Sequence, residues 1–308
     1  MKKIKEITGF DELYVYDNSI IVENKKSIQQ IDNNLNLFPL VEGDIYMVTI
    51  LGDDLFYQIE NSHNIYIYKK DIVLKDDFSY ALISALKCDI YIYISSKRYD
   101  ASIFLDSNLG FVGKAPRYCN FSYKQYLILN DNLRKNFICY KLYDKLWEYK
   151  HTDDSNIQII SGYKDKVLIY SENGDLFTLN LNNGELCWKY PEQCPYSRYG
   201  FFDNYIYHIY KNEFREISAD TGKICRVMDI RDLREKEHFF ATAGIKIYDE
   251  YVFCRDVDGA VAIIDRKTLV LKEILHFEKH LINWEHSLHW VNNRLYVQDT
   301  EYVIHIFE

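Results

Sequence analysis

Histidines and carboxylates are densest between His276 and Trp290, a segment with four of the chain's nine histidines and two glutamates. Imidazole nitrogens and carboxylate oxygens are common zinc ligands, so metal binding is the first chemistry to consider. His276 and His280 would share a face only if the segment were helical. On a strand, His286 and His289 point to opposite faces and cannot converge on one ion. We therefore predict structural or interfacial histidines and no metal site, while a ligand role for this segment stays open.

Other sequence motifs that carry chemistry are sparse. Asp256-Val257-Asp258-Gly259 has the start of a calcium loop but lacks the later ligands and the bidentate glutamate, and a tight hairpin turn accounts for it. The chain contains no G-x-S-x-G, H-E-x-x-H or P-loop pattern. We therefore assign no catalytic, cofactor-binding or metal-binding residue and expect no cofactor. Such motifs would not reveal an enzyme whose site combines residues from several repeats.

Charge and composition favour a protein partner over nucleic acid or membrane. The net charge is −9, from 46 acidic and 37 basic residues, which disfavours phosphate binding and favours a basic partner. No apolar run reaches the length of a membrane span, and the basic N-terminus leads into acidic residues instead of the apolar core of a secretory signal. The seven cysteines include no C-x-x-C pair and are expected to be reduced thiols. We therefore expect a cytoplasmic protein.

A unit of paired short strands recurs about every forty residues and must position any functional side chain. It is clearest where the predicted strands Val167–Tyr170, Leu176–Leu179 and Leu186–Tyr190 are separated by the turns Glu172–Asp175 and Asn182–Gly184. Such a small antiparallel sheet cannot bury both faces alone, so copies must stack around an axis. The repeat therefore predicts the blades of a β-propeller.

Second and third strands of each predicted blade can be paired along the whole chain. The pairs are Ile20–Glu23 with Ile28–Ile31, Leu55–Ile59 with Ile65–Tyr68, Ile90–Ile94 with Ser102–Leu105, Tyr126–Leu129 with Asn136–Tyr140, Val167–Tyr170 with Leu176–Leu179, Tyr205–Tyr210 with Phe214–Ile217, Tyr251–Cys254 with Ala260–Ile264, and Arg294–Val297 with Val303–Phe307. This count predicts an all-β fold, a single propeller domain over residues 1–308 with eight four-stranded antiparallel blades; a misread first pair would leave seven.

Two further segments complete this prediction. The chain stops just after the last third strand, and Lys3–Ile7 has the alternation needed to supply the missing fourth strand and close the ring. Asp229–His238 is too charged for a strand and long enough for one or two helical turns between blades. We expect it to be a solvated connector.

The turns of the later blades carry a family resemblance. Leu179–Trp188 and Ile217–Ile224 resemble the Ala-x-Asp-x-x-Thr-Gly-x-x-x-Trp repeat of quinoprotein-dehydrogenase-type (PQQ-like) propellers, and Ile264–Leu269 keeps the Asp but loses the Gly. In this repeat Gly takes a positive φ, Asp or Asn caps the turn, and Trp packs between adjacent blades. Enzymes of that family hold pyrroloquinoline quinone with calcium. The short chain and the missing adjacent Cys-Cys pair place the resemblance with non-catalytic members.

Turns between second and third strands share one rim of a propeller with the connections between blades, and here that rim is rich in acidic residues. We predict that it docks a basic protein, because complementary charge steers association and aromatic side chains anchor it. The predicted partner-binding residues are Asp76, Asp77, Asp153, Asp154, Glu172, Asp175, Glu213, Asp256, Asp258, Tyr80, Tyr118 and Tyr196.

These observations predict a non-catalytic, monomeric, protein-binding propeller that contacts neither nucleic acid nor membrane. The bias towards Lys, Ile, Asn and Tyr is typical of an AT-rich bacterial genome, and small acidic bacterial proteins of this kind resemble immunity proteins that neutralise polymorphic toxins. The partner would then be a basic toxin or effector domain. Two alternatives stay open: a lyase or hydrolase with its site in the central channel, and a scaffold subunit of a larger complex.

Overall fold

The chain folds into two compact units of β-sheet. The computed structural model describes residues 1–51, 54–60, 64–69, 73–75, 81–84, 90–96, 99–106, 111–115, 119–124, 126–130, 136–141, 144–151, 155–194, 199–239, 244–256, 258–282 and 287–308. Unit 1 comprises Met1–Tyr46, Ser197–Ser218 and Lys223–Glu308, and unit 2 comprises Met47–Tyr196 and the turn Ala219–Gly222. Every strand of both units belongs to a four-stranded sheet.

Unit 1 contains the sheets from both ends of the chain. The first is formed by β2 (Glu12–Tyr16), β3 (Ser19–Asn24), β4 (Ser27–Ile31) and β5 (Leu37–Glu42). Two later sheets are formed by β22 (Tyr199–Phe202), β23 (Tyr205–Tyr210), β24 (Glu213–Ser218) and β25 (Ile224–Asp229), and by β26 (Gly244–Ile247), β27 (Tyr251–Asp256), β28 (Ala260–Asp265) and β29 (Val270–His276). The last is formed by β30 (Leu288–Val291), β31 (Arg294–Gln298), β32 (Ile304–Phe307) and β1 (Lys3–Ile7).

Unit 2 contains the sheets from the middle of the chain. They are formed by β6 (Ile45–Leu51), β7 (Asp54–Ile59), β8 (Asn64–Ile67) and β9 (Val73–Lys75); β10 (Ala81–Ser84), β11 (Ile90–Ser96), β12 (Tyr99–Asp106) and β13 (Phe111–Ala115); β14 (Cys119–Tyr123), β15 (Tyr126–Asn130), β16 (Asn136–Lys141) and β17 (Asp144–Lys150); and β18 (Ile157–Tyr163), β19 (Lys166–Ser171), β20 (Leu176–Asn180) and β21 (Leu186–Lys189). Successive strands in each sheet are antiparallel neighbours, so each predicted pair of second and third strands coincides with two adjacent strands.

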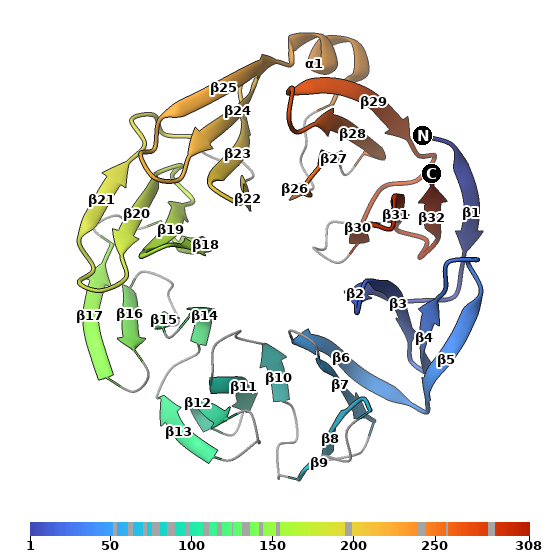
Figure 1. Ribbon diagram of the computed structural model, residues 1–308, viewed down its shortest axis with the longest axis horizontal. Coiled ribbons are helices and arrows are strands. Elements are labelled where there is room, and N and C mark those ends of the chain that lie inside the picture. Colours follow the sequence, from blue (N-terminus) through green and yellow to red (C-terminus); the bar gives the residue numbers. More distant parts are fainter. Residues whose placement is uncertain are drawn as a thin grey trace. The chain divides into compact units, whose positions relative to one another are not determined.

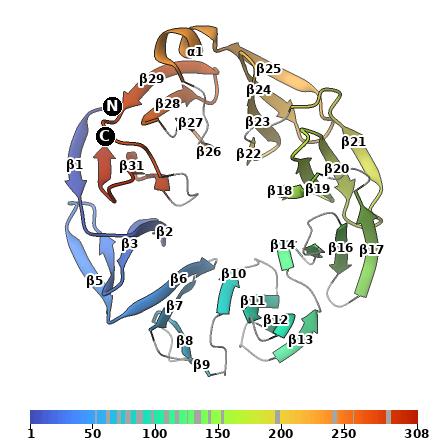
Figure 2. The ribbon, with the colours of Figure 1, turned by 180° about the vertical axis from the view of Figure 1, so that it is seen from behind.

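β1, the first strand of the chain, completes the last sheet of unit 1. It pairs antiparallel with β32, with Lys5 opposite Ile306 and Ile7 opposite Ile304. The two chain ends therefore lie side by side, as both views of the ribbon show (Figures 1 and 2). This pairing confirms the predicted role of Lys3–Ile7 as the fourth strand of that sheet.

A short helix, α1 (Arg231–Glu237), follows β25 in the charged segment where helical turns were predicted. Leu233 anchors the helix, because it is buried in a cluster with Phe214 and Phe239. His238 ends the helix in the left-handed conformation, with φ of 52°. No helix in the described ranges is long and apolar enough to cross a lipid bilayer.

Strands in the middle of the sheets are apolar on both faces, because each face packs against other side chains. In β19, three consecutive residues from Val167 to Ile169 are fully buried. Val167 and Ile169 pack with Phe177 and Leu179 of β20 in one core cluster. That cluster also contains Ile128 and other residues of the β14–β17 sheet, so it joins successive sheets of unit 2.

Tryptophans on outer strands of unit 2 pack against glycines in turns of other sheets, as the repeat predicts. The Trp147 indole donates to the Leu181 carbonyl over 2.8 Å and lies against Gly184, which has a φ of +74°. A Cβ added to Gly184 would come within 2.8 Å of the Trp147 ring. Asn180 caps this turn by accepting the Asn182 N–H over 2.8 Å. Glycine is therefore required here by both its conformation and the close approach of the ring.

The next turn repeats the arrangement with one difference. The Trp188 indole donates to the Ala219 carbonyl over 3.0 Å, and its ring lies against Gly222, whose φ is +68°. The difference is the carboxylate of Asp220, at the position that Asn182 occupies in the previous turn. Its carboxylate accepts hydrogen bonds from Tyr163 over 3.0 Å and from Lys164 over 2.6 Å, so it ties this turn to the β18–β19 hairpin.

Candidate functional site

More than half of the predicted partner-binding residues lie outside the part of the chain that the structure describes, and their roles stay predictions. They are Asp76, Asp77, Tyr80, Tyr118, Asp153, Asp154 and Tyr196.

Three predicted partner-binding residues have carboxylates that reach solvent. Glu172 is exposed and accepts from the Asn156 amide over 2.9 Å. The Glu213 side chain is 42% exposed and accepts from Arg215 Nε over 2.7 Å. Asp258 is also exposed, with 73% of its side chain accessible to solvent. These carboxylates can meet a partner without rearrangement of the backbone.

Two other predicted partner-binding residues are buried, which corrects the prediction for them. Asp175 is 2% exposed and Asp256 is 1% exposed. The Asp175 carboxylate pairs with Lys189 Nζ at 2.8 Å and accepts from the Gln193 amide at 3.3 Å, so it fastens its turn to the outer strand. Asp256 turns back on its own hairpin, where one oxygen lies 3.3 Å from the Asp258 nitrogen. Short aspartate side chains at turns often bond the local backbone in this way.

Residues 277–282 follow β29 and form the first part of the connection towards β30; we call them the 277–282 rim. The Phe277 N–H donates to the Gly259 carbonyl over 2.7 Å, and the Thr300 N–H donates to the His280 carbonyl over 2.9 Å. A Cβ on Gly259 would come within 2.8 Å of the Phe277 oxygen. Backbone hydrogen bonds on both sides therefore hold residues 277–282 in place.

The 277–282 rim and its two neighbouring turns expose an excess of negative charge. Asp258, Glu278 and Glu301 are exposed acids. Lys279 lies among them and pairs with Glu301 at 2.6 Å, which raises the pKa of the lysine. His280 faces Asp258 at 3.8 Å. Three exposed carboxylates surround a single ammonium group, so the surface is acidic.

The described histidines between His276 and Trp290 lie in different surroundings. His289 is buried on β30, whereas His276 and His280 are exposed. His286 lies outside the described residues. Among the residues that are described, no group of three or more His, Cys, Asp or Glu side chains is arranged to hold a metal ion. The two exposed histidines pair with different carboxylates, His276 with Glu237 at 3.4 Å and His280 with Asp258 at 3.8 Å.

Sequence analysis missed a pair of carboxylates on the first hairpin. Glu12 and Glu23 stand opposite each other on β2 and β3, and the Tyr14 hydroxyl lies between them. It donates to Glu12 and lies 3.3 Å from Glu23 Oε2. Burial, followed by the charge of Glu12, raises the pKa of Glu23 to about 7. Counting back from the Asp17–Asn18 turn sets this register, so the pair could have been found from the sequence.

The Glu23 carboxyl should make the fold less stable as the pH rises. Its folded pKa lies above the unfolded value, so its contribution is fully present below about pH 4.5 and is lost as the pH rises through about 7. As the pH rises from 5 to 8, the free energy of unfolding of Glu23→Gln should therefore increase by about 1–2 kcal/mol relative to that of the parent. Urea unfolding at both pH values measures this gain. Glu12→Gln, which removes the repulsion, should give part of it; an equal difference at both pH values would contradict the assignment.

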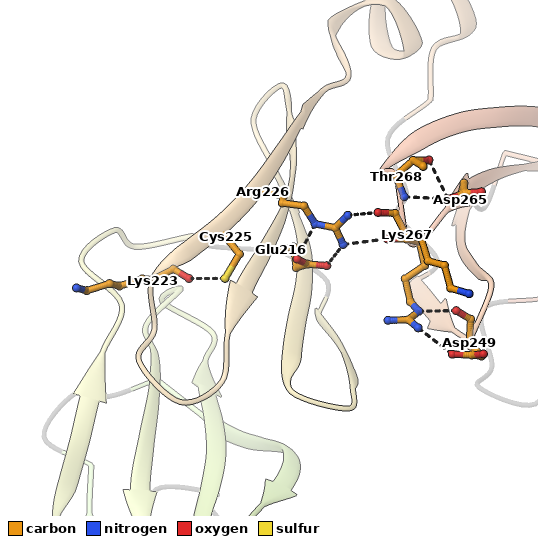
Figure 3. A network of polar contacts seen from close by, with 9 residues as sticks. Glu216, Lys223, Cys225, Arg226, Asp249, Asp265, Lys267 and Thr268 are labelled. Carbon is orange, nitrogen blue, oxygen red and sulfur yellow. Dashed lines mark hydrogen bonds and ion pairs between the residues drawn. The ribbon is translucent and has the colours of Figure 1, made fainter.

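A second polar cluster surrounds Arg226 of β25 (Figure 3). Arg226 Nε donates to the buried Glu216 carboxylate over 2.8 Å, and the guanidinium also donates to the carbonyls of Arg266 and Lys267. Arg266 in turn donates to Asp249 and lies over the Phe202 ring at 4.6 Å. The Glu216 carboxylate raises the pKa of Arg226. Since the Glu216 carboxylate is buried and the Arg226 guanidinium bonds carbonyls in a turn of another sheet, this cluster holds the two sheets together.

Comparisons with known proteins place this arrangement in one fold class. No protein-family model matches the sequence, and no curated protein matches it. Solved structures match it over nearly its whole length, and their likeness shows that the chain has the β-propeller fold that the repeat predicts. At 10–13% identity the likeness concerns the fold alone.

Three of these structures span almost the same length as this chain. BamB from Moraxella catarrhalis is 13% identical, with a TM-score of 0.60 over 99% of this chain and 96% of that one. The computationally designed Ika8 protein is 11% identical, with a TM-score of 0.69 over 97% and 96%. Sqt1 of Saccharomyces cerevisiae is 10% identical, with a TM-score of 0.65 over 99% and 98%.

Proposed function

We propose that this chain is a non-catalytic, protein-binding β-propeller that docks a basic partner on its acidic rim. In this proposal the four-stranded sheets are eight blades of one ring, which the β1–β32 pairing closes, and the repeat belongs to the non-catalytic PQQ-like branch. The protein acts as a monomer in the cytoplasm. The 277–282 rim with its neighbouring turns is the described part of the docking surface.

The observation that carries the proposal is an exposed acidic surface on a fixed backbone. Asp258 and Glu301 have side chains that are 73% and 57% exposed, and they stand on turns bonded to the 277–282 rim. A backbone that is ordered before binding loses little conformational entropy when a partner docks. The net charge of −9 adds a long-range field that attracts basic proteins.

The specific form that we propose is an immunity-type inhibitor of a basic toxin or effector domain. An inhibitor of this kind works by covering the partner's active cleft, so none of its own residues needs chemical activation. The sequence resemblance to small acidic bacterial immunity proteins supports this form, and the acidic rim supplies the complementary charge. The same rim would serve a scaffold subunit, but a scaffold would leave the activity of the partner unchanged.

Charge reversal on the rim should weaken partner binding. Asp258→Lys combined with Glu301→Lys should raise the dissociation constant for the product of the neighbouring reading frame about tenfold at low salt, mainly through slower association. The effect should shrink as the salt concentration rises, because exposed charges are screened. Surface plasmon resonance at two salt concentrations measures both effects, and an assay of the partner's activity separates inhibitor from scaffold.

The matched control moves the same charge elsewhere. Glu42→Lys with Glu185→Lys changes the net charge equally at two exposed positions outside the rim. This control should bind with nearly the affinity of the parent chain. If both double variants weaken binding equally, net charge and not the rim is responsible, and the proposed docking surface is wrong.

A further inference from the structure

Four outer-strand residues occupy one structural position and make the same kind of contact. They are Trp147 of β17, Trp188 of β21, Arg226 of β25 and Lys5 of β1, and they stand opposite Cys139, Thr178, Glu216 and Ile306 on the third strands. On the other side, the same third-strand residues are paired with a residue of the second strand. These residues are, in the same order, Ile128, Leu168, Tyr207 and Tyr296, and each is the third residue of its strand. The position is therefore equivalent in all four sheets.

Each of these side chains donates to a backbone carbonyl in a turn of another sheet. The two indoles donate to Leu181 and Ala219, at 2.8 and 3.0 Å. Arg226 donates to Arg266 over 2.9 Å, as well as to Lys267, and Lys5 donates to Leu35. Figure 3 shows the Arg226 guanidinium between Glu216 and the turn that contains Lys267. The shared chemistry is one N–H donor that satisfies a turn carbonyl.

The positive-φ residue of the contacted turn changes with the donor. It is Gly184 or Gly222 where the donor is tryptophan, with φ of +74° and +68°. It is Leu269 or Leu35 where the donor is Arg226 or Lys5, with φ of 54° and 64°. A Cβ on Gly222 would come within 2.6 Å of the Trp188 ring, so an indole excludes a side chain at this position.

The third-strand residue opposite the donor also changes. It is the small Thr178 behind Trp188, but Glu216 behind Arg226. The Glu216 side chain is only 3% exposed, so its charge needs the guanidinium as a partner inside the protein. Leu269, in turn, contributes to the core cluster around Phe214 and Phe239. A leucine in the left-handed conformation is strained, and its burial offsets that strain.

We infer that the β18–β21 and β22–β25 sheets each contact a turn of another sheet through one of two alternative three-residue clamps, whose tryptophan and arginine cannot be exchanged singly. One clamp is Thr178–Trp188–Gly222, in which an indole lies on a bare backbone. The other is Glu216–Arg226–Leu269, in which a buried ion pair reaches a turn whose leucine enters the core. A tryptophan in place of Arg226 would press on the Leu269 side chain and would leave the buried Glu216 carboxylate without its cation, so the two donors need different turns.

A four-protein cycle on the second clamp tests this inference. The proteins are the parent, Leu269→Gly, Glu216→Thr/Arg226→Trp, and the triple variant that combines all three substitutions. Leu269→Gly should lower the Tm of the parent by roughly 5 °C, because a buried side chain is lost. In the tryptophan background the same substitution should raise the Tm, because it makes room for the indole. Calorimetry measures the Tm of all four proteins. Leu269→Gly removes the same leucine side chain in both backgrounds, so this loss cancels when its two effects on the Tm are compared.

The inference is overturned if Leu269→Gly lowers the Tm by the same amount in both backgrounds. Val227→Trp is the control for adding an indole to β25 at an exposed position, and it should shift the Tm by less than about 2 °C. If the tryptophan background does not fold, recovery of folded protein on adding Leu269→Gly is the supporting result. If the triple variant also fails to fold, the reciprocal test is made on the first clamp. Adding Thr178→Glu/Trp188→Arg should then restore folding of the Gly222→Leu variant. The inference is overturned if folding is not restored.

Discussion

Replacing Gly222 by alanine is expected to lower the free energy of unfolding by about 3 kcal/mol. Two costs combine at this position. The backbone φ of +68° is unfavourable for alanine, and the new Cβ would come within 2.6 Å of Trp188 Cε3. The ring cannot swing away freely, because its indole N–H donates to the Ala219 carbonyl over 3.0 Å. Chemical denaturation of parent and variant measures the loss.

Gly9 provides a matched control for the backbone term. Its φ is also positive, at +89°, but no atom lies within 4 Å of the site where a Cβ would be placed. Gly9→Ala should therefore lose only about 1 kcal/mol. If both variants lose the same amount, the contact between Trp188 and the turn contributes nothing beyond backbone conformation, and the packing assigned to this turn is wrong.

His208 is expected to make the protein strongly sensitive to acid. The residue is fully buried on β23, and its ring stacks on Tyr199 with centroids 5.4 Å apart. Burial and, secondarily, the charge of Arg215 lower the pKa of His208 to about 3. Because the folded pKa lies below the unfolded one, the folded state binds fewer protons in this window. Stability therefore falls as the pH falls from about 6.5 towards 3, by about 1.4 kcal/mol per pH unit from this group alone.

His208→Gln removes this proton and keeps a polar side chain at the position. The variant should be less stable than the parent at pH 7.5, because it loses the ring that stacks on Tyr199. Between pH 7.5 and pH 4.5 the parent should lose about 3 kcal/mol more than the variant. Protonation of the carboxylates affects the stability of both proteins equally, so it cancels in this difference. Parallel stability curves over that range would show that His208 does not titrate as its burial implies.

The fold could be predicted from the sequence because its signals are local and repeated. Alternating residues and short turns defined pairs such as Val167–Tyr170 with Leu176–Leu179, which are adjacent strands in the structure. The Trp188 contact with Gly222 followed from the same repeat, since a ring lying on a backbone needs glycine. Lys3–Ile7 was recognisable because the last sheet lacked one strand and this segment had the matching alternation.

The candidate site could be predicted only in part, because alternation does not report which turn residues are buried. Asp175 and Glu172 stand on the same turn, yet only Glu172 reaches solvent. Lys189, fourteen residues further along the chain, turns the Asp175 carboxylate inwards. Leu269 shows a similar limit. The motif calls for glycine at its position, and the reason for leucine lies in Arg226, on the outer strand of a different sheet.

The pairing of β1 with β32 fixes the order of events when the ribosome makes this protein. Lys5 emerges early, but its partner Ile306 is translated only about three hundred residues later. At the usual rate of about 5–20 residues per second, that strand waits on the order of half a minute with its hydrogen-bonding edge bare. Nascent chains are therefore exposed to mispairing with neighbours during this interval, and this sheet can form only once Ile306 has left the ribosome.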